Sequence, residues 1–225
     1  MLCQSENSVG WHKHVNVRYR RIEKEKEGSC GMGGGRNIRP HKKRGVMLMS
    51  KIRIATVWLD GCSGCHMSFL DMDERLLAVA DKIDLVYSPL VDAKVFPENV
   101  DLTIVEGAVS NEDDLHKIKL VRSRTKLLMA LGDCAVTSNV PGMRNYFSRD
   151  QLLRRAYVEN AATNQGIPTQ VIPALLPKSR PIHEYVKVDI FLPGCPPHAD
   201  TIFAAVAALL EGRVPEAKEL EVRFG

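Results

Sequence analysis

Short apolar runs alternate with stretches of helical spacing along most of the chain after residue 50. Each run is rich in Val, Ile and Leu and is short enough for a strand that is buried on both faces. The runs cover residues 52–59, 83–90, 102–105, 126–131 and 188–192. We therefore expect five strands, and their composition favours a parallel sheet.

Three segments between or after these runs have the spacing of helices. Residues 66–82 place Phe69 and Leu76, among other apolar side chains, at helical intervals. Residues 112–124 predict a second, more polar helix, and residues 199–210 predict a third. Strands and helices that alternate in this way are typical of an α/β fold with a mainly parallel, right-handed, doubly wound sheet.

Residues 136–185 interrupt the alternation. Five prolines and two glycines punctuate this segment, and one helix is expected near residues 150–160. We expect an excursion that covers part of the sheet or contacts a partner.

The first 46 residues differ in character from the rest. They contain eleven Lys and Arg against four Glu, a net charge of +7, whereas the remaining 179 residues carry −3. Seven of the 16 glycines lie here, and no apolar run could bury a face. We expect a disordered basic tail over residues 1–46 and a folded domain over residues 47–225. A nucleic-acid-binding arm is the alternative, but the interleaved aromatics that would support a nucleic-acid partner are missing.

The sequence also bears on location. No apolar stretch approaches the roughly 18–20 residues that span a bilayer. Arg20 and Arg21 are followed by charged residues and glycines, and not by the hydrophobic segment of an export signal. We expect a cytoplasmic protein with no membrane span, in which six cysteines indicate metal or redox chemistry and not disulfides.

Four cysteines follow the carboxyl ends of predicted strands: Cys62 and Cys65 the first, Cys134 the fourth and Cys195 the fifth. These ends lie along one edge of a parallel sheet, so distant loops can converge there. Four thiolates suit a tetrahedral zinc or an iron-sulfur cluster. Most zinc sites use two close pairs of ligands. This chain has one close pair and two distant single cysteines, an arrangement that fits a cubane cluster better. Ordinary buried cysteines are the alternative for any one taken alone.

Each cysteine loop also contains glycine, which lets the backbone approach a bulky ligand and direct amide groups at it. The expected cofactor-binding positions are Gly61, Gly64, Gly132 and Gly194. Pro196 completes this set because it suits a rigid turn into the third helix.

Four motifs together resemble the proximal-cluster motifs of small subunits of nickel-iron hydrogenases. They are Gly61-Cys62-Ser63-Gly64-Cys65, Val105-Glu106-Gly107, Gly132-Asp133-Cys134-Ala135 and Leu192-Pro193-Gly194-Cys195-Pro196-Pro197. Their order and spacing match over residues 51–215. The resemblance is strongest to the short small subunits of cytoplasmic NAD-reducing, bidirectional hydrogenases.

This resemblance implies a flavodoxin-like domain that holds one 4Fe-4S cluster on Cys62, Cys65, Cys134 and Cys195. It also implies two partners, a large subunit with the nickel-iron site and a flavin and iron-sulfur diaphorase, which together convert H2 and NAD+ to NADH and H+. No cysteine follows Cys195, so a single relay cluster is expected. FMN is a second candidate cofactor, disfavoured because the cysteine loop replaces the Ser/Thr-rich phosphate loop after the first strand.

Four further residues lie in or near these motifs, and the resemblance gives a role to the first of them. Glu106 is expected beside the cluster, in a proton path to the large subunit, with a solvated loop acid as the alternative. Trp58 and His198 are candidates for packing or hydrogen bonding near the cluster sulfurs, although core or interface packing explains Trp58 equally well. His66 is expected to cap the first helix or to face solvent.

Two other functions remain open. The cluster subunit of respiratory complex I shares the Gly-Cys-Pro-Pro ending, but it typically has two adjacent cysteines at the first motif, whereas Ser63 and Gly64 separate them here. The non-redox alternative is a zinc-stabilised binding module. Metal analysis distinguishes it from an iron-sulfur protein.

Overall fold

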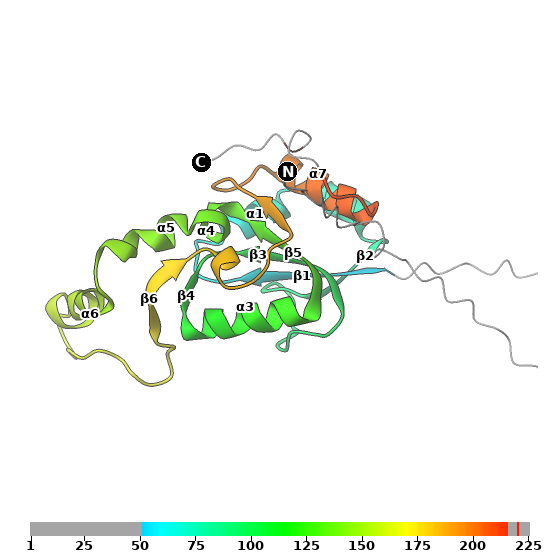
Figure 1. Ribbon diagram of the computed structural model, residues 1–225. Coiled ribbons are helices and arrows are strands. Elements are labelled where there is room, and N and C mark those ends of the chain that lie inside the picture. Colours follow the sequence, from blue (N-terminus) through cyan, green and yellow to red (C-terminus); the bar gives the residue numbers. More distant parts are fainter. Residues whose placement is uncertain (1–50, 216–219, 221–225) are drawn as a thin grey trace, which may run out of the picture. The chain divides into compact units, whose positions relative to one another are not determined.

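Five parallel strands form the central sheet of the computed structural model, which describes residues 51–215 and residue 220 (Figure 1). The predicted tail of residues 1–46 lies outside the described residues. In spatial order the strands are β2 (Ile83–Tyr87), β1 (Ile52–Trp58), β3 (Val100–Glu106), β5 (Thr125–Leu131) and β7 (Ile190–Leu192). From β1, the described part of the chain places β2 on one side and then adds strands on the other. This is the doubly wound α/β arrangement that the sequence predicted.

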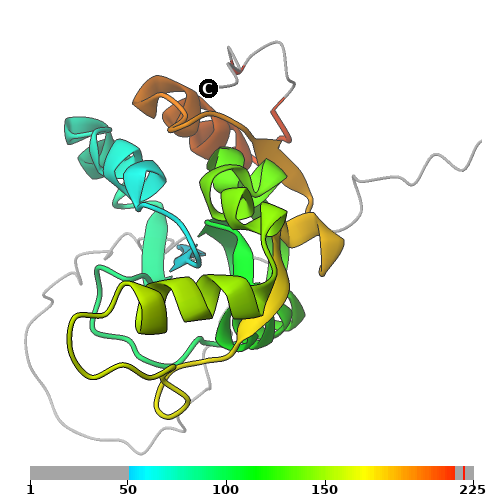
Figure 2. The ribbon, with the colours of Figure 1, turned by 90° about the vertical axis from the view of Figure 1, so that its left-hand side faces the viewer.

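Helices cover both faces of this sheet. The helices α1 (Gly64–Leu70) and α7 (Ala199–Leu210) lie on one face, and α3 (Glu112–Arg124) lies on the other (Figures 1 and 2). Alternate side chains of a strand point to opposite faces. Ile54 and Ala55 of β1 therefore enter different cores, on the α7 side and the α3 side. This explains why the strands are apolar at most positions.

Two of the three predicted helices have the predicted bounds. In α3, the Asn111 side chain accepts a hydrogen bond from the Asp114 backbone N–H and caps the first turn. The third, over residues 66–82, is two helices, α1 and α2 (Glu74–Val79), so the prediction of one continuous helix is wrong. The break lies at Asp73, whose φ of 49° is incompatible with a right-handed helix.

The excursion contains short elements that the sequence did not separate. In chain order they are α4 (Gly132–Thr137), α5 (Asn139–Gly142), η2 (Met143–Tyr146), α6 (Arg149–Arg154), the short π-helix η3 (Arg155–Glu159), β6 (Leu175–Arg180) and η4 (Ile182–Glu184). The helix expected near residues 150–160 corresponds to α6 and η3. Strand β6 pairs antiparallel with β4 (Val109–Asn111) in a second, two-stranded sheet. Ile182 is fully buried in the α3-side core, so the end of the excursion covers part of the sheet.

The position of the excursion matters for the site. Figure 1 shows α5 and α6 projecting past the edge at which the parallel strands end, and Figure 2 looks onto that edge. A buried set of hydroxyls joins this segment to the second sheet, because Ser179 Oγ lies 2.7 Å from Ser110 Oγ and 2.9 Å from Ser138 Oγ. Within the part of the chain that the structure describes, no helix is both long and apolar enough to cross a membrane.

Candidate functional site

The carboxyl edge of the sheet holds the four cysteines that the sequence singled out. Cys62 follows β1, and Cys65 lies in the first turn of α1. Cys134 lies in α4, directly after β5, and Cys195 follows β7. These cysteines form no disulfide; Cys65 and Cys134 are buried, whereas Cys62 and Cys195 are exposed. Cys3 and Cys30 lie outside the described residues.

The electrostatics show that the four thiols share one environment. Burial is the main cause that raises the pKa of Cys65, followed by the charges of Glu106, Cys134, Cys62 and Cys195. Burial also raises the pKa of Cys134, with further contributions from Cys195, Cys62 and Glu106. A negative charge on one thiol therefore disfavours ionisation of the others. A bound cationic centre reverses that preference, because it stabilises thiolate ligands.

Glycines allow the cysteine loops to approach one another. A Cβ placed on Gly132 would lie closer than 3.0 Å to Cys65 Sγ, and its φ is +82°. A Cβ on Gly64 would lie 3.3 Å from Cys62 Sγ. Any larger residue at Gly132 would therefore displace a thiol that the sequence predicts to be a ligand.

The other glycines shape the loops without such contact with a sulfur. A Cβ on Gly61 would lie 3.3 Å from the Gly107 Cα, in the neighbouring turn. Gly194 has a φ of +136°, and a Cβ there would lie 2.7 Å from Pro197 Cα. Gly194 therefore makes the tight turn around Cys195 sterically possible, and Pro196 follows through a cis peptide bond.

Asp133 ties the third and fourth cysteine loops together. Its backbone N–H donates to the Gly194 carbonyl at 2.9 Å, and its side-chain Oδ1 accepts the Gly194 N–H at 2.6 Å. Asp133 is buried, so both bonds are shielded from water. The sequence analysis quoted this residue only as part of a motif. Its role depends on a residue 61 positions away, which no local pattern reveals.

The expectation for His66 is wrong. Its side chain is buried, and its ring Nδ1 contacts Glu106 Oε2, which also accepts the His66 backbone N–H at 2.9 Å. The solvated-acid alternative for Glu106 is excluded as well, since only 1% of this residue is exposed. The ring Nε2 of His66 is buried without a hydrogen-bond partner. A paired acid and imidazole therefore lie directly beside the first cysteine loop.

The two remaining candidates face outward. Trp58 is 44% exposed at the end of β1, and its Nε1 donates to the Gly61 carbonyl at 3.3 Å. Core packing of Trp58 is thus excluded. His198 is exposed and caps α7, where its side chain accepts the Asp200 backbone N–H. A contact between His198 and a cysteine sulfur is not observed among the described residues.

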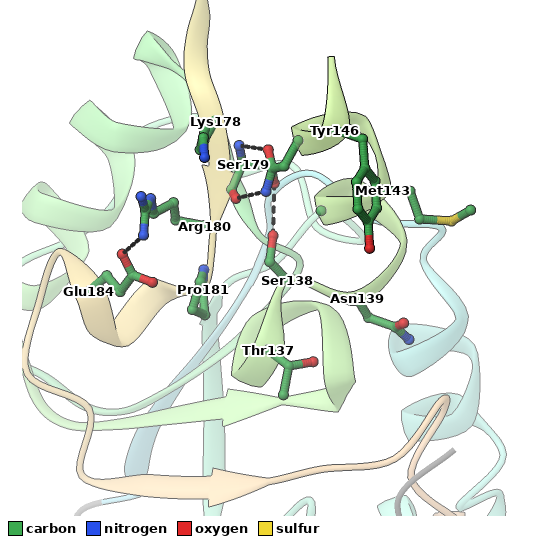
Figure 3. Close-up of a pocket in the computed structure, with 12 residues that line it drawn as sticks. Thr137, Ser138, Asn139, Met143, Tyr146, Lys178, Ser179, Arg180, Pro181 and Glu184 are labelled. Carbon is green, nitrogen blue, oxygen red and sulfur yellow. Dashed lines mark hydrogen bonds and ion pairs between the residues drawn. The ribbon is translucent and has the colours of Figure 1, made fainter. Parts of the chain in front are cut away.

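A cavity of about 410 Å³ adjoins the site between α4, α5, η2 and β6 (Figure 3). Polar groups in its wall bond to one another: Asn145 donates to the Ser179 carbonyl at 2.7 Å and accepts the Ser179 N–H at 2.8 Å. Asn139, also in the wall, donates its side-chain Nδ2 to Cys195 Sγ at 3.6 Å. The cavity is therefore connected to the cysteine edge through one side chain.

The four cysteine thiols, together with the glycines in the loops that carry them, fit an iron-sulfur cluster. Cysteine thiolates are the usual ligands of such clusters, and four of them complete a cubane. Among the described residues, no three His, Cys, Asp or Glu side chains lie close enough to share a single metal ion. Ligands of a four-iron cluster bind different irons, so they surround a larger volume than the ligands of one ion.

Comparison with known proteins identifies the family. The family model described as "NADH ubiquinone oxidoreductase, 20 Kd subunit" matches residues 62–209, a range that includes all four cysteines. The chain belongs to this family. Within it, the chain is 44% identical over 168 residues to the NAD-reducing hydrogenase HoxS subunit delta of Cupriavidus necator, covering 72% of this chain and 80% of the relative.

Two further similar proteins are also hydrogenase subunits or chains. A subunit of the F420-non-reducing hydrogenase vhu of Methanocaldococcus jannaschii is 38% identical over 172 residues, 76% of this chain. The chain spans only 60% of the length of that relative. A crystal structure of an NAD+-reducing [NiFe]-hydrogenase in the H2-reduced state contains a chain that is 39% identical, with a TM-score of 0.75; the match covers 78% of this chain and all of that one. The resemblance to small subunits of nickel-iron hydrogenases, an oxidoreductase family, is thereby confirmed.

Proposed function

We propose that this chain is the electron-relay small subunit of an NAD-reducing nickel-iron hydrogenase and that it holds one 4Fe-4S cluster. The observation that carries the proposal is the convergence of four cysteines from three strand ends, in a chain that is 44% identical to HoxS subunit delta. When bound, such a cluster accepts and donates single electrons. The cytoplasmic location of the proposed complex remains an expectation from the sequence.

Different residues have different roles in holding the proposed cluster. Cys62, Cys65, Cys134 and Cys195 supply the thiolates. Gly132 and Gly194 let the loops approach, and Asp133 fixes the third loop against the fourth. The buried Glu106 places negative charge beside the site and, with His66, is the candidate for a proton path to the partner. A carboxylate at this position also disfavours further negative charge on a cluster and so lowers its potential.

The open side of the site is where we place the nickel-iron large subunit. Cys62 and Cys195 are exposed there. The neighbouring α5 and η2 present Val140, Met143 and Tyr146, which are 56%, 66% and 89% exposed. Apolar side chains beside two exposed ligands suit a protein surface that excludes water from the cluster. Electrons then leave toward a flavin and iron-sulfur diaphorase, in the overall reaction H2 + NAD+ → NADH + H+.

Two alternatives are less well supported. The two residues between Cys62 and Cys65, together with the identity to HoxS subunit delta, favour a hydrogenase over a quinone reductase. An FMN beside the cluster is disfavoured because the loop after β1 is occupied by Cys62 and by the turn into α1.

The test is metal and spectroscopic analysis of the complex purified without oxygen from co-expressed subunits. We expect about four irons and four acid-labile sulfides for this chain, and a 4Fe-4S signal in EPR spectra of the hydrogen-reduced complex. One zinc per chain without sulfide would overturn the proposal. A cluster-containing chain that associates with quinone-reductase subunits, and not with a nickel-bearing one, would favour the complex I alternative.

A further inference from the structure

Asn139 is the first residue of α5 and reaches the cysteine edge from the excursion. Its Nδ2 lies 3.6 Å from Cys195 Sγ, a distance suited to an N–H···S hydrogen bond. The preceding Ser138 has a φ of 69°, and this left-handed residue turns the chain between α4 and α5. The turn brings a side chain from outside the four cysteine motifs into contact with the fourth cysteine.

Glu106 acts in the opposite sense on the same site. Its side chain is buried beside the first cysteine loop, where Oε2 accepts the backbone N–H of His66, the residue after Cys65, at 2.9 Å. A negative charge held there opposes the addition of further negative charge to the sulfurs, whereas the amide N–H of Asn139 favours it.

We propose that Asn139 is a positioning residue that raises the reduction potential of the cluster by donating its side-chain N–H to Cys195 Sγ. The inference rests on the proposed function, since it requires a cluster on the four cysteines. Reduction adds negative charge that the sulfurs share, so a donor to sulfur stabilises the reduced state more than the oxidised state. Asn139 then counteracts the effect of Glu106 on the same centre.

The surroundings hold Asn139 in place without burying it. Ser138 is anchored to Ser179 through their hydroxyls at 2.9 Å, and Asn145 binds the Ser179 backbone through both side-chain atoms. Figure 3 shows Asn139 in the cavity wall, apart from these hydrogen bonds. Asn139 itself is exposed, so its replacement leaves the anchoring network and the cores intact.

The test is a redox titration of the complex, followed by EPR, for wild type, Asn139→Leu and Asn139→Asp. Leu keeps the approximate size but has no donor, and Asp replaces the donor with a negative charge. We expect Asn139→Leu to reduce the ratio of reduced to oxidised cluster at a fixed potential by about tenfold, which corresponds to a midpoint lower by about 59 mV. The midpoint of Asn139→Asp should be lower still. Iron and sulfide content should equal that of wild type in both variants.

The matched control is Asn160→Leu, because Asn160 is also exposed in the excursion and lies at the end of η3. Its midpoint should equal that of wild type. An unchanged midpoint in Asn139→Leu with full iron content would overturn the inference and leave the proposed function intact. A wild-type complex without iron and sulfide in this chain would overturn the proposed function itself. The two failures are therefore distinguishable in one set of samples.

Discussion

Replacing Gly132 with alanine should empty the cysteine site while leaving the fold in place. The new Cβ would lie closer than 3.0 Å to Cys65 Sγ. Ordinary contact begins at about 3.5 Å, so the sulfur must move by roughly 0.5 Å or more. Metal–ligand distances tolerate only about 0.2 Å. The expected result is loss of most of the iron and sulfide from this chain.

The same change also strains the backbone, because Gly132 has a φ of +82°. A non-glycine residue in such a conformation costs about 1–3 kcal/mol. For a domain of this size, each kcal/mol lowers Tm by about 2–4 °C. We therefore expect the iron-free Gly132→Ala protein to unfold several degrees below iron-free wild type.

Gly166→Ala is the matched control, since a Cβ on Gly166 would have no heavy atom within 4 Å. Its iron content and Tm should equal those of wild type. Thermal unfolding of the apo proteins and iron and sulfide determination on the anaerobic complexes measure the two effects separately. Full cluster content in Gly132→Ala would refute the reasoning that the close approach of Gly132 to Cys65 is needed for the site.

Three further changes test other parts of the structure. Cys134→Ala should abolish both the iron and the hydrogen-dependent reduction of NAD+, and retention of both would contradict the ligand assignment. Glu106→Leu removes the acceptor of the buried His66 N–H and should cost about 1–3 kcal/mol in unfolding free energy; Glu106→Gln, which keeps an oxygen acceptor, should lose less. Burial raises the pKa of Asp114, so the folded state binds its proton more tightly than the unfolded state, and stability falls as pH rises through this pKa. Asp114→Asn should therefore unfold at higher temperature than wild type at pH 8 but not at pH 3; a constant difference in Tm would exclude this titration as the cause.

The sequence predicted those features that local pattern determines. Helix α3 is bounded by the Asn111 cap and begins with the acidic residues Glu112 and Asp113, which match the positive end of the helix dipole. A strand that is buried on both faces gives an apolar run in the sequence, so it can be recognised without knowing which strand it pairs with. The cysteine edge followed from one topological rule about parallel sheets, combined with motifs of a known family.

Features that depend on distant partners were missed. Strand β4 has only three residues, and its pairing with β6 spans more than 60 positions, so no periodicity marks it. His66 opens a helix, where solvent exposure is a reasonable expectation, but its partner Glu106 lies 40 residues away. Asn139 carried no signal either, because it is a polar residue in a proline-rich segment. Its contact with Cys195 becomes visible only when the excursion is folded against the sheet.

The order of strands across the sheet also determines when the site comes into existence. Residues emerge from the ribosome in chain order, and β3, β5 and β7 are added successively on one side of β1. The fourth cysteine arrives only with β7, the last of these strands, and α7 then covers one face beside it. A nascent chain that stops short of β7 has only three of the four cysteines of the site and an incomplete sheet edge. If the four cysteines hold the proposed cluster, its complete ligand set exists only after nearly the whole domain has been synthesised.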